Sequence, residues 1–401
     1  MSFTRLPATA KTAPTPFKVA VPDAAIQELR TLLKLARVAP PTYESLRSDR
    51  KFGVTTEWIK SAKAEWESFD WRKFERHINT FPQYLTPVID TDGTSFNLHF
   101  LALFSEKPDA VPILMLHGWP GSFLEFLPIL SLLSARYTPA TLPYHIIVPS
   151  IPGYGFSSPA PLDREFQLQD VARLLNTLMA QLGFADGYVV QGGDIGSQIA
   201  RILVSEHASC KAIHMNFCYM TKPADFDASR LSERDSATIA RSDEFARSGA
   251  SYAFEQATRP ATLGFALASS PLALLAWIGE KFLDWTDEDP PMATILESLS
   301  LYWFTDTIAT SFYPYRQTTP VDPNHVGISN NPAWRITKPF GFSSFPREIL
   351  PSPRAWIETT GTLAFYREHD TGGHFAAFER PEVLLKDVED FVAQVWPECN
   401  K

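Results

Sequence analysis

Short apolar runs alternate along this chain with stretches in which apolar residues recur every three or four positions. Eight segments have the length and apolar content of strands: residues 84–90, 96–104, 111–116, 145–148, 187–191, 211–217, 339–345 and 363–367. Residues 170–182 and 195–204 have helical spacing. Buried strands that alternate with helices predict an α/β fold with a mostly parallel sheet flanked by helices.

Two regions depart from this alternation. Residues 1–82 read as an N-terminal helical arm, with a helix expected over 23–37. Between 218 and 335 the pattern becomes irregular, helical and rich in aromatic residues, and strand-like text resumes only afterwards. We therefore expect a core made of residues 83–217 and 336–401, with a helical cap inserted over the carboxyl edge of the sheet.

Composition narrows the function classes. The net charge is −9 and no block of lysine and arginine stands out, which argues against a nucleic-acid partner. Hydrophobic residues make up 45% of the chain, enough for a large packed core. The 3 cysteines have no CxxC spacing, and so sparse a set favours a reducing compartment, the cytoplasm, over a disulfide framework.

One segment has a composition that a membrane helix also shows. Residues 260–279 carry no charge and are long enough to span a bilayer. Pro260, Gly264 and Pro271 interrupt the segment, so we expect a buried helical hairpin of the cap that lines an apolar pocket. The first residues are polar and broken by proline, and they predict neither a signal peptide nor a membrane anchor.

The sequence motif around Asp194 contains the first candidate catalytic residue. Asp194 follows a predicted strand, precedes a predicted helix and has glycine at positions 192, 193 and 196. That pattern is typical of a nucleophile elbow, in which a sharp turn exposes the central side chain. Here the central residue is aspartate, and the chain has no GxSxG match, which weakens an esterase or lipase interpretation. Taken alone, the aspartate could equally cap the helix that follows it.

A second motif, His117-Gly118-Trp119-Pro120-Gly121, follows the strand predicted at 111–116. A loop at this place supplies backbone donors for an oxyanion in folds with a nucleophile elbow. We expect the N–H groups of Trp119 and Ile195 to form this oxyanion hole. His117 is expected to orient the loop rather than to carry protons.

His374 is the candidate general base, because it lies in a glycine-rich loop after the last predicted strand. Glu348 is the candidate acid partner, and Asp370, in the histidine's own loop, is a rival. The chain order Asp194, Glu348, His374 matches nucleophile, acid and base. A metal site made by His369, Asp370 and His374 is the alternative, but the spacing fits no helical site.

Taken together, the motifs resemble those of the microsomal-type epoxide hydrolases in their soluble fungal form, members of the α/β-hydrolase superfamily. The matching text comprises Phe69–Arg72, His117–Glu125, Gly192–Ser197 and Gly372–Pro381. The resemblance implies that hydrophobic epoxides and water are converted to vicinal diols through an ester on Asp194. It also implies a homodimer and neither a cofactor nor a metal.

The resemblance further implies two cap tyrosines that bind the epoxide oxygen, and the local text matches them to Tyr252 and Tyr315. Tyr302 and Tyr313 are nearby alternatives. Phenols, with reference pKa values of about 10, remain protonated at neutral pH and can donate a proton to an alkoxide.

Two other functions are compatible with parts of this text. A haloalkane dehalogenase would share the aspartate and the histidine, but dehalogenases usually have tryptophan directly after the nucleophile, where this chain has Ile195. A non-catalytic binding protein on the same fold would show damage to one triad position, and none is visible.

Overall fold

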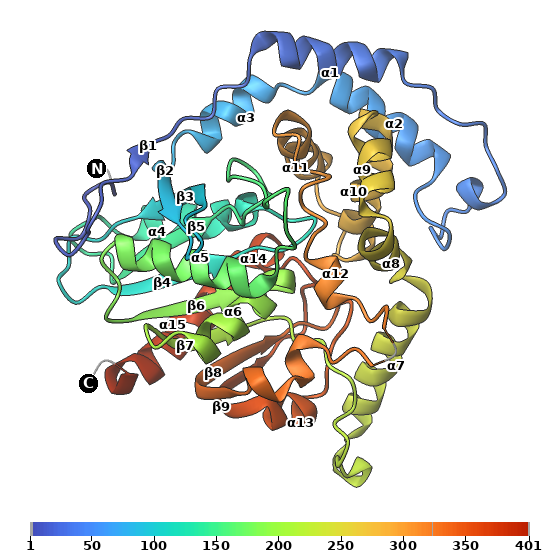
Figure 1. Cartoon of the computed structure of the whole chain (residues 1–401). Coiled ribbons are helices and arrows are strands. Elements are labelled where there is room, and N and C mark those ends of the chain that lie inside the picture. Colours follow the sequence, from blue (N-terminus) through green and yellow to red (C-terminus); the bar gives the residue numbers. More distant parts are fainter. Residues whose placement is uncertain (1–2, 323, 400–401) are drawn as a thin grey trace.

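A sheet of nine strands crosses the centre of the computed structural model, which describes residues 3–322 and 324–399 (Figure 1). The strands are β1 (Thr15–Pro16), β2 (Gln83–Ile89), β3 (Ser95–Leu103), β4 (Val111–Leu116), β5 (Tyr144–Pro149), β6 (Tyr188–Gly192), β7 (Cys210–Met215), β8 (Ile336–Ser344) and β9 (Gly361–Glu368). Their order is β1-β2-β3-β5-β4-β6-β7-β8-β9.

The sheet is mostly parallel, which confirms the α/β fold. Strands from β5 through β4, β6, β7 and β8 to β9 run parallel, whereas β1, β2, β3 and β5 pair antiparallel. The eight predicted strands occur within a few residues of their expected ends. The edge strand β1 was not predicted, because two residues, one of them proline, are too few to show alternation.

Helices cover both faces of this sheet. The core helices are α4 (Leu127–Arg136), α5 (Leu168–Gln181), α6 (Asp194–Glu206), α13 (Arg354–Ile357), α14 (Ala376–Glu379) and α15 (Pro381–Cys399). Helices α5 and α6 pack on one face, and α4 and α15 pack on the other (Figure 1). Central strands are therefore apolar on both sides; β4, for example, is buried along its whole length.

The N-terminal arm lies across the cap. It contains α1 (Asp23–Leu35), α2 (Thr56–Ser68) and α3 (Trp71–Ile78), and these helices contact the cap helices α10 and α11 (Figure 1). Trp66 and Trp71 are almost fully buried. The indole N–H of Trp66 donates to Ser300 Oγ at 2.9 Å, and the Trp71 ring packs edge-on against Phe304. These contacts fix the arm to the cap.

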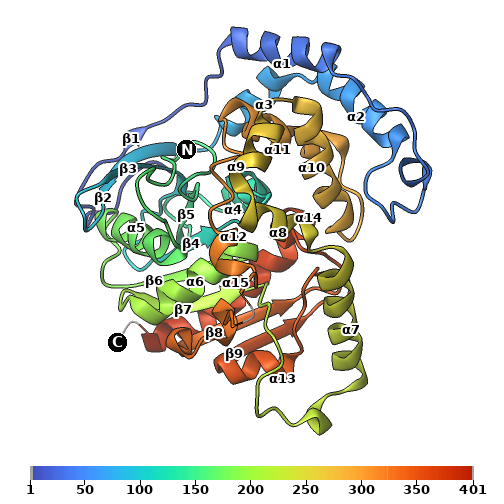
Figure 2. The ribbon, with the colours of Figure 1, turned by 45° about the vertical axis from the view of Figure 1, so that its right-hand side comes forward.

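The cap separates β7 from β8 in the chain and lies over the carboxyl ends of the parallel strands (Figure 2). Its helices are α7 (Glu233–Ser248), α8 (Ser251–Thr258), α9 (Pro260–Ala268), α10 (Pro271–Asp284), α11 (Met292–Phe304) and α12 (Tyr315–Thr318). Short 3-10 turns occur at Glu44–Leu46, Phe123–Phe126, Ala228–Arg230, Ile328–Asn330, Pro332–Trp334 and Glu358–Thr360.

The uncharged segment 260–279 folds as α9 and the first part of α10, which meet at an angle of 115°. Within the described residues, a helix long and apolar enough to cross a membrane alone is not found, and α9 and α10 reach that length and composition only as a bent pair. Leu263 and Trp277 of this segment line a groove between the arm and the cap, whereas α8 and α12 line the pocket that contains Asp194.

Candidate active site

Asp194 stands on a strained turn between β6 and α6. Its φ is +44°, in the left-handed region that costs a residue with a side chain free energy. Close packing permits the turn: a Cβ on Gly196 would lie 2.3 Å from the carbonyl oxygen of Leu116. Glycine at this position therefore lets α6 start directly against β4 and directs the Asp194 carboxylate out of the core.

The loop after β4 contacts the Asp194 carboxylate. A Cβ on Gly118 would lie 2.1 Å from Asp194 Oδ1, so the loop can approach only because residue 118 is glycine. The Trp119 N–H donates to the same oxygen at 2.8 Å. The N–H of Ile195 belongs to the first turn of α6, where the helix supplies no acceptor. The Trp119 N–H thus contacts the Asp194 carboxylate, and the role of the Ile195 N–H as the second oxyanion donor stays a prediction.

His117 holds this loop in place, in the orienting position expected from the sequence. Its Nδ1 lies 3.0 Å from the Gly118 carbonyl oxygen, and its Nε2 accepts the N–H of Ile151 at 3.1 Å. Burial lowers the pKa of His117 to about 4, so the ring is neutral at neutral pH and can accept that bond.

His374 lies between two carboxylates. Its Nδ1 is 2.6 Å from Glu348 Oε1, and its Nε2 is 3.2 Å from Asp194 Oδ2, without the alignment of a good hydrogen bond. Asp370, the rival acid, is exposed to solvent. His369 turns instead to Asp387 at 2.6 Å, so His369, Asp370 and His374 do not converge on one point.

The histidine loop is pinned by a carboxylate that the sequence pattern did not single out. Glu379 accepts the N–H groups of Asp287 (2.8 Å), Phe375 (3.0 Å) and Gly373 (3.1 Å). Three backbone donors on one carboxylate hold the residues on both sides of His374. From the sequence, Glu379 was expected only to open the closing helix. Its hydrogen bonds to the histidine loop become visible only in the tertiary structure.

The acid loop is tied to the cap in the same way. Arg241 of α7 donates to the carbonyl oxygens of Glu348 (2.7 Å) and Arg347 (2.9 Å). The N–H of His374 donates to the carbonyl oxygen of Trp285 at 2.9 Å. The geometry of the histidine–glutamate pair therefore depends on the cap being docked.

Electrostatics favour a charged His374. Burial opposes the imidazolium, but the carboxylates of Glu348 and Asp194 outweigh it and raise the pKa of His374 well above its usual value. The ring thus carries a proton at neutral pH.

Two tyrosines from different cap helices meet over Asp194. Tyr252 of α8 stacks on the Trp119 ring with a centroid separation of 5.4 Å and an interplanar angle of 13°, and Tyr315 of α12 meets the same indole edge-on at 5.7 Å. The Tyr315 hydroxyl is buried without an acceptor among the described residues. Burial and the nearby negative charges raise the pKa of both phenols, so they keep their protons.

The alternative tyrosines are occupied elsewhere. Tyr302 donates to the Gly121 carbonyl oxygen at 3.1 Å, and Tyr313 donates to that of Pro152 at 3.0 Å. Neither lines the pocket that contains Asp194, Tyr252 and Tyr315.

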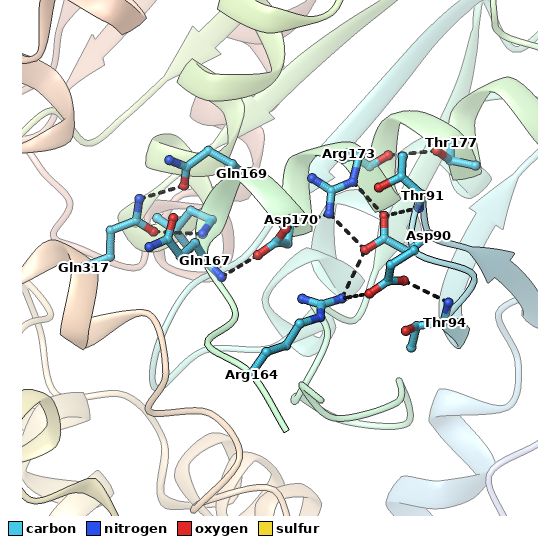
Figure 3. Close-up of polar contacts among 12 residues, drawn as sticks. Asp90, Thr91, Thr94, Arg164, Gln167, Gln169, Asp170, Arg173, Thr177 and Gln317 are labelled. Carbon is cyan, nitrogen blue, oxygen red and sulfur yellow. Dashed lines mark hydrogen bonds and ion pairs between the residues drawn. The ribbon is translucent and has the colours of Figure 1, made fainter. Parts of the chain in front are cut away.

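The turn that carries Tyr315 is fastened to the core by Gln317 (Figure 3). Gln317 Oε1 accepts the N–H of Leu168 at 2.8 Å, and its Nε2 donates to Gln169 Oε1 at 2.7 Å. Both partners belong to the start of α5. Because α12 is only one turn long, this anchor helps to set the position of the Tyr315 hydroxyl.

The start of α5 is itself braced by charges on the β2–β3 side (Figure 3). Asp90 is buried and accepts from Arg173 at 2.6 and 2.9 Å, and Arg173 also bonds Asp170 at 2.6 Å. Arg164 bonds Asp92 at 2.7 Å. The hydrogen bond to Arg173 and the neighbouring charge lower the pKa of Asp90. The ion pair between Asp90 and Arg173 therefore stabilises the start of α5, to which the turn that carries Tyr315 is attached.

The tyrosines and Asp194 face a pocket of about 160 Å³. Its other walls are mostly apolar side chains: Phe217, Phe245, Phe254, Ile349 and Leu350. A carboxylate on an elbow, a paired histidine and two protonated phenols around an apolar pocket define an α/β hydrolase whose candidate nucleophile is a carboxylate.

Comparison with known proteins narrows this class. The family described as "Epoxide hydrolase N terminus" matches residues 14–126, and that described as "alpha/beta hydrolase fold" matches residues 111–300. A putative epoxide hydrolase of Dothistroma septosporum is 43% identical over 97% of this chain and 92% of its own length. Epoxide hydrolase 1 of Sus scrofa is 33% identical over 94% and 88%.

Solved structures agree with the sequences. The structure of Aspergillus niger epoxide hydrolase has a TM-score of 0.93 and 50% identity, and the match covers 99% of this chain and 100% of that one. Juvenile hormone epoxide hydrolase of the silkworm Bombyx mori has a TM-score of 0.84 at 26% identity, covering 97% and 96%. This chain belongs to the epoxide hydrolase family.

Proposed function

We propose that this epoxide hydrolase works through a covalent ester on Asp194. The observation that carries the proposal is the placement of the Asp194 carboxylate between the Trp119 N–H and His374 Nε2, at the pocket lined by Tyr252 and Tyr315. Such a site offers a nucleophile, a base and an acid on the three sides of one bound molecule.

In the first step, an Asp194 oxygen attacks an epoxide carbon and the carbon–oxygen bond of the ring breaks. The departing alkoxide is strongly basic, so it takes a proton from Tyr252 or Tyr315. The products are an ester on Asp194, a hydroxyl group on the substrate and a phenolate. The imidazolium of His374 then supplies the proton that restores the phenol.

This transfer is favoured by the loss of a charge. The Asp194 carboxylate is one of the two groups that raise the pKa of His374, and esterification neutralises it. His374 therefore becomes a better proton donor to the phenolate and, once neutral, a base for water. Glu348 remains to hold the ring in the tautomer that presents Nε2 to the ester.

In the second step, neutral His374 takes a proton from water as the water oxygen attacks the ester carbonyl of Asp194. The oxyanion accepts hydrogen bonds from the Trp119 and Ile195 N–H groups. Collapse of this intermediate breaks the bond to the diol, which leaves with the proton of the hydroxyl that water added; the Asp194 carboxylate and the His374 imidazolium are returned. Atoms and charges match those at the start.

The pocket supports hydrophobic epoxides as the substrate class. Phenylalanine and aliphatic side chains dominate its walls, and the polar groups gather at the reacting end. Aryl and alkyl epoxides of moderate size suit this lining better than charged ones, because a charge would lose its hydration without a partner.

Labelled water tests the ester directly. After one turnover of styrene oxide in oxygen-18 water, we expect heavy oxygen in the peptide that contains Asp194 and none in the diol. Asp370→Asn is the control, because Asp370 is exposed and should leave the label at residue 194. Heavy oxygen in the diol with none in the protein would exclude a carboxylate ester.

We also propose a homodimer, as the resemblance to the family implies. The arm exposes Tyr43, Leu46 and Phe52, apolar side chains that a second copy could cover. Light scattering on the purified full chain measures the mass, and a monomer at micromolar concentration would contradict this proposal.

A cytoplasmic location is the last element that we propose. Cys210, Cys218 and Cys399 are all unpaired, and the first two are buried, as expected in a reducing compartment. Fractionation of cells that express the full chain tests the location.

A further inference from the structure

Lys281 of α10 is a buried cation beside the candidate active site. Only 5% of the residue is exposed, which is unusual for lysine. Its Nζ lies 4.9 Å from the centroid of the Tyr252 ring and 5.5 Å from that of Trp277. Its carboxylate partner is the neighbouring Glu280, which is about one-third exposed.

We propose that Lys281 is a positioning residue for ring opening, which acts by stabilising negative charge on Tyr252. The inference deepens the proposed function and rests on it, because the charge arises when Tyr252 gives its proton to the epoxide oxygen. An ammonium on the face of an aromatic ring is attracted to its electrons, and the attraction increases when the phenol becomes a phenolate.

The surroundings of Tyr252 explain why such a cation is needed. Burial disfavours a phenolate at this position, and so does the charge of Glu348, which remains after Asp194 is esterified; a hydrogen bond with Tyr315 favours the phenolate. The rings that contact Tyr252 are those of Trp119, Trp285 and Tyr315, which are uncharged. Within the described residues, Lys281 is the cation that lies over the Tyr252 ring, so it opposes these effects.

The Lys281 ammonium lies between the active-site pocket and a groove at the protein surface. Tyr252 and Lys281 both line a groove of about 1110 Å³ between the arm and the cap, and Tyr252 also lines the pocket that contains Asp194. The other charged groups at this groove are Arg50, Lys51, Glu244, Glu255, Glu280 and Asp284. Glu280 and Asp284 partly neutralise Lys281. The Glu280 carboxylate is about one-third exposed and partly solvated, which leaves the buried ammonium to act on the ring.

A substitution at Lys281 separates this role from simple packing. Lys281→Met keeps the length of the chain and removes the charge; we expect ester formation to slow about tenfold, which corresponds to about 1.4 kcal/mol of barrier height. Hydrolysis of the ester should be unchanged, and Lys281→Arg should retain most of the rate. Lys51→Met is the matched control, since Lys51 lines the same groove and also lies over an aromatic ring, but that ring is Phe52 (5.7 Å to the centroid) and Lys51 is exposed.

A double-mutant cycle provides the decisive readout. In a Tyr252→Phe background, where Tyr315 remains as a donor, Lys281→Met should cause no further loss in ester formation. An equal loss in both backgrounds, or equal slowing of both chemical steps, would overturn the inference and leave a packing role.

Glu280→Gln covers the case in which Lys281→Met fails to fold. Removing this partly exposed charge leaves the ammonium unneutralised, so ester formation should be as fast as in the wild type or about twofold faster. A slower rate would count against the inference. The ester is measured by intact mass in every variant: its absence in the wild type would contradict the proposed function, whereas an unchanged rate in Lys281→Met would contradict only the role of Lys281.

Discussion

Replacing Glu348 by glutamine removes one negative charge from the His374 ring and keeps the length of the side chain. Glu348 Oε1 lies 2.6 Å from His374 Nδ1, and the glutamate also accepts the N–H of Ile349 at 2.6 Å. An amide oxygen can take over both contacts, so we expect the fold to survive. The change therefore isolates the charge from the geometry.

The magnitude follows from the separation of the charges. At about 4 Å between charge centres and an effective dielectric constant of about 20, a unit pair is worth about 4 kcal/mol, or about 3 pKa units. Burial already opposes the charged ring, and Glu348 is the largest influence that raises the pKa of His374. Without it, the pKa should fall, and the imidazolium that forms as water attacks the ester loses its counter-charge.

Ester formation should then change little, while ester hydrolysis should slow by a factor between about 10² and about 10⁴, the upper figure being typical of an amide in this position of a triad. Rapid quenching followed by intact mass spectrometry follows the ester with time, and we expect it to accumulate in Glu348→Gln. Glu348→Asp keeps the charge and Asp370→Asn tests the exposed rival; both should hydrolyse the ester much faster. If Glu348→Gln hydrolyses the ester at the wild-type rate, or if Asp370→Asn is the slower variant, the assignment of the acid is wrong.

Three further predictions concern other parts of the site. His374→Gln should accumulate the ester on Asp194, because the base for water is lost; intact mass of a folded, substrate-binding variant without adduct would contradict this. Replacing both Tyr252 and Tyr315 by phenylalanine should slow ester formation at least about 10²-fold and hydrolysis far less, as rapid quenching can show; equal slowing of both steps would argue against proton donation. The free energy of unfolding should fall as pH drops from about 6.5 to 5, because the pKa of His117 is lowered to about 4 and the native state then binds fewer protons than the unfolded chain. Urea unfolding at the two pH values should show a loss of about 2 kcal/mol from this group, reduced in His117→Asn, and a flat profile would contradict it.

The strands and core helices were predictable because their signal is local. Apolar runs such as residues 111–116 are buried on both faces, and the spacing over 170–182 matches the buried stripe of α5. The exceptions have physical reasons. The pairing of β1 depends on the edge offered by β2, and the wall formed by α8 and α12 depends on how the cap docks.

The candidate site divides in the same way. Asp194, Trp119 and His374 lie in motifs whose glycines mark tight turns, so the adjacent residues in the sequence are enough to identify these three as candidate site residues. The sequence favoured Glu348 over Asp370 as the acid but left Asp370 open, since both follow predicted strands near His374. The structure places Glu348 against the ring and leaves Asp370 in solvent.

By itself, the sequence determined the order of the core strands and the residue types available for chemistry, because hydrophobic spacing and turn-forming residues act over a few positions. Only the tertiary structure decided which carboxylate contacts His374, that Tyr252 and Tyr315 share a pocket with Asp194 while Tyr302 and Tyr313 bind backbone, and that a buried ammonium lies over the Tyr252 ring. These facts join residues far apart in the chain, and the packing of cap, arm and core brings them together.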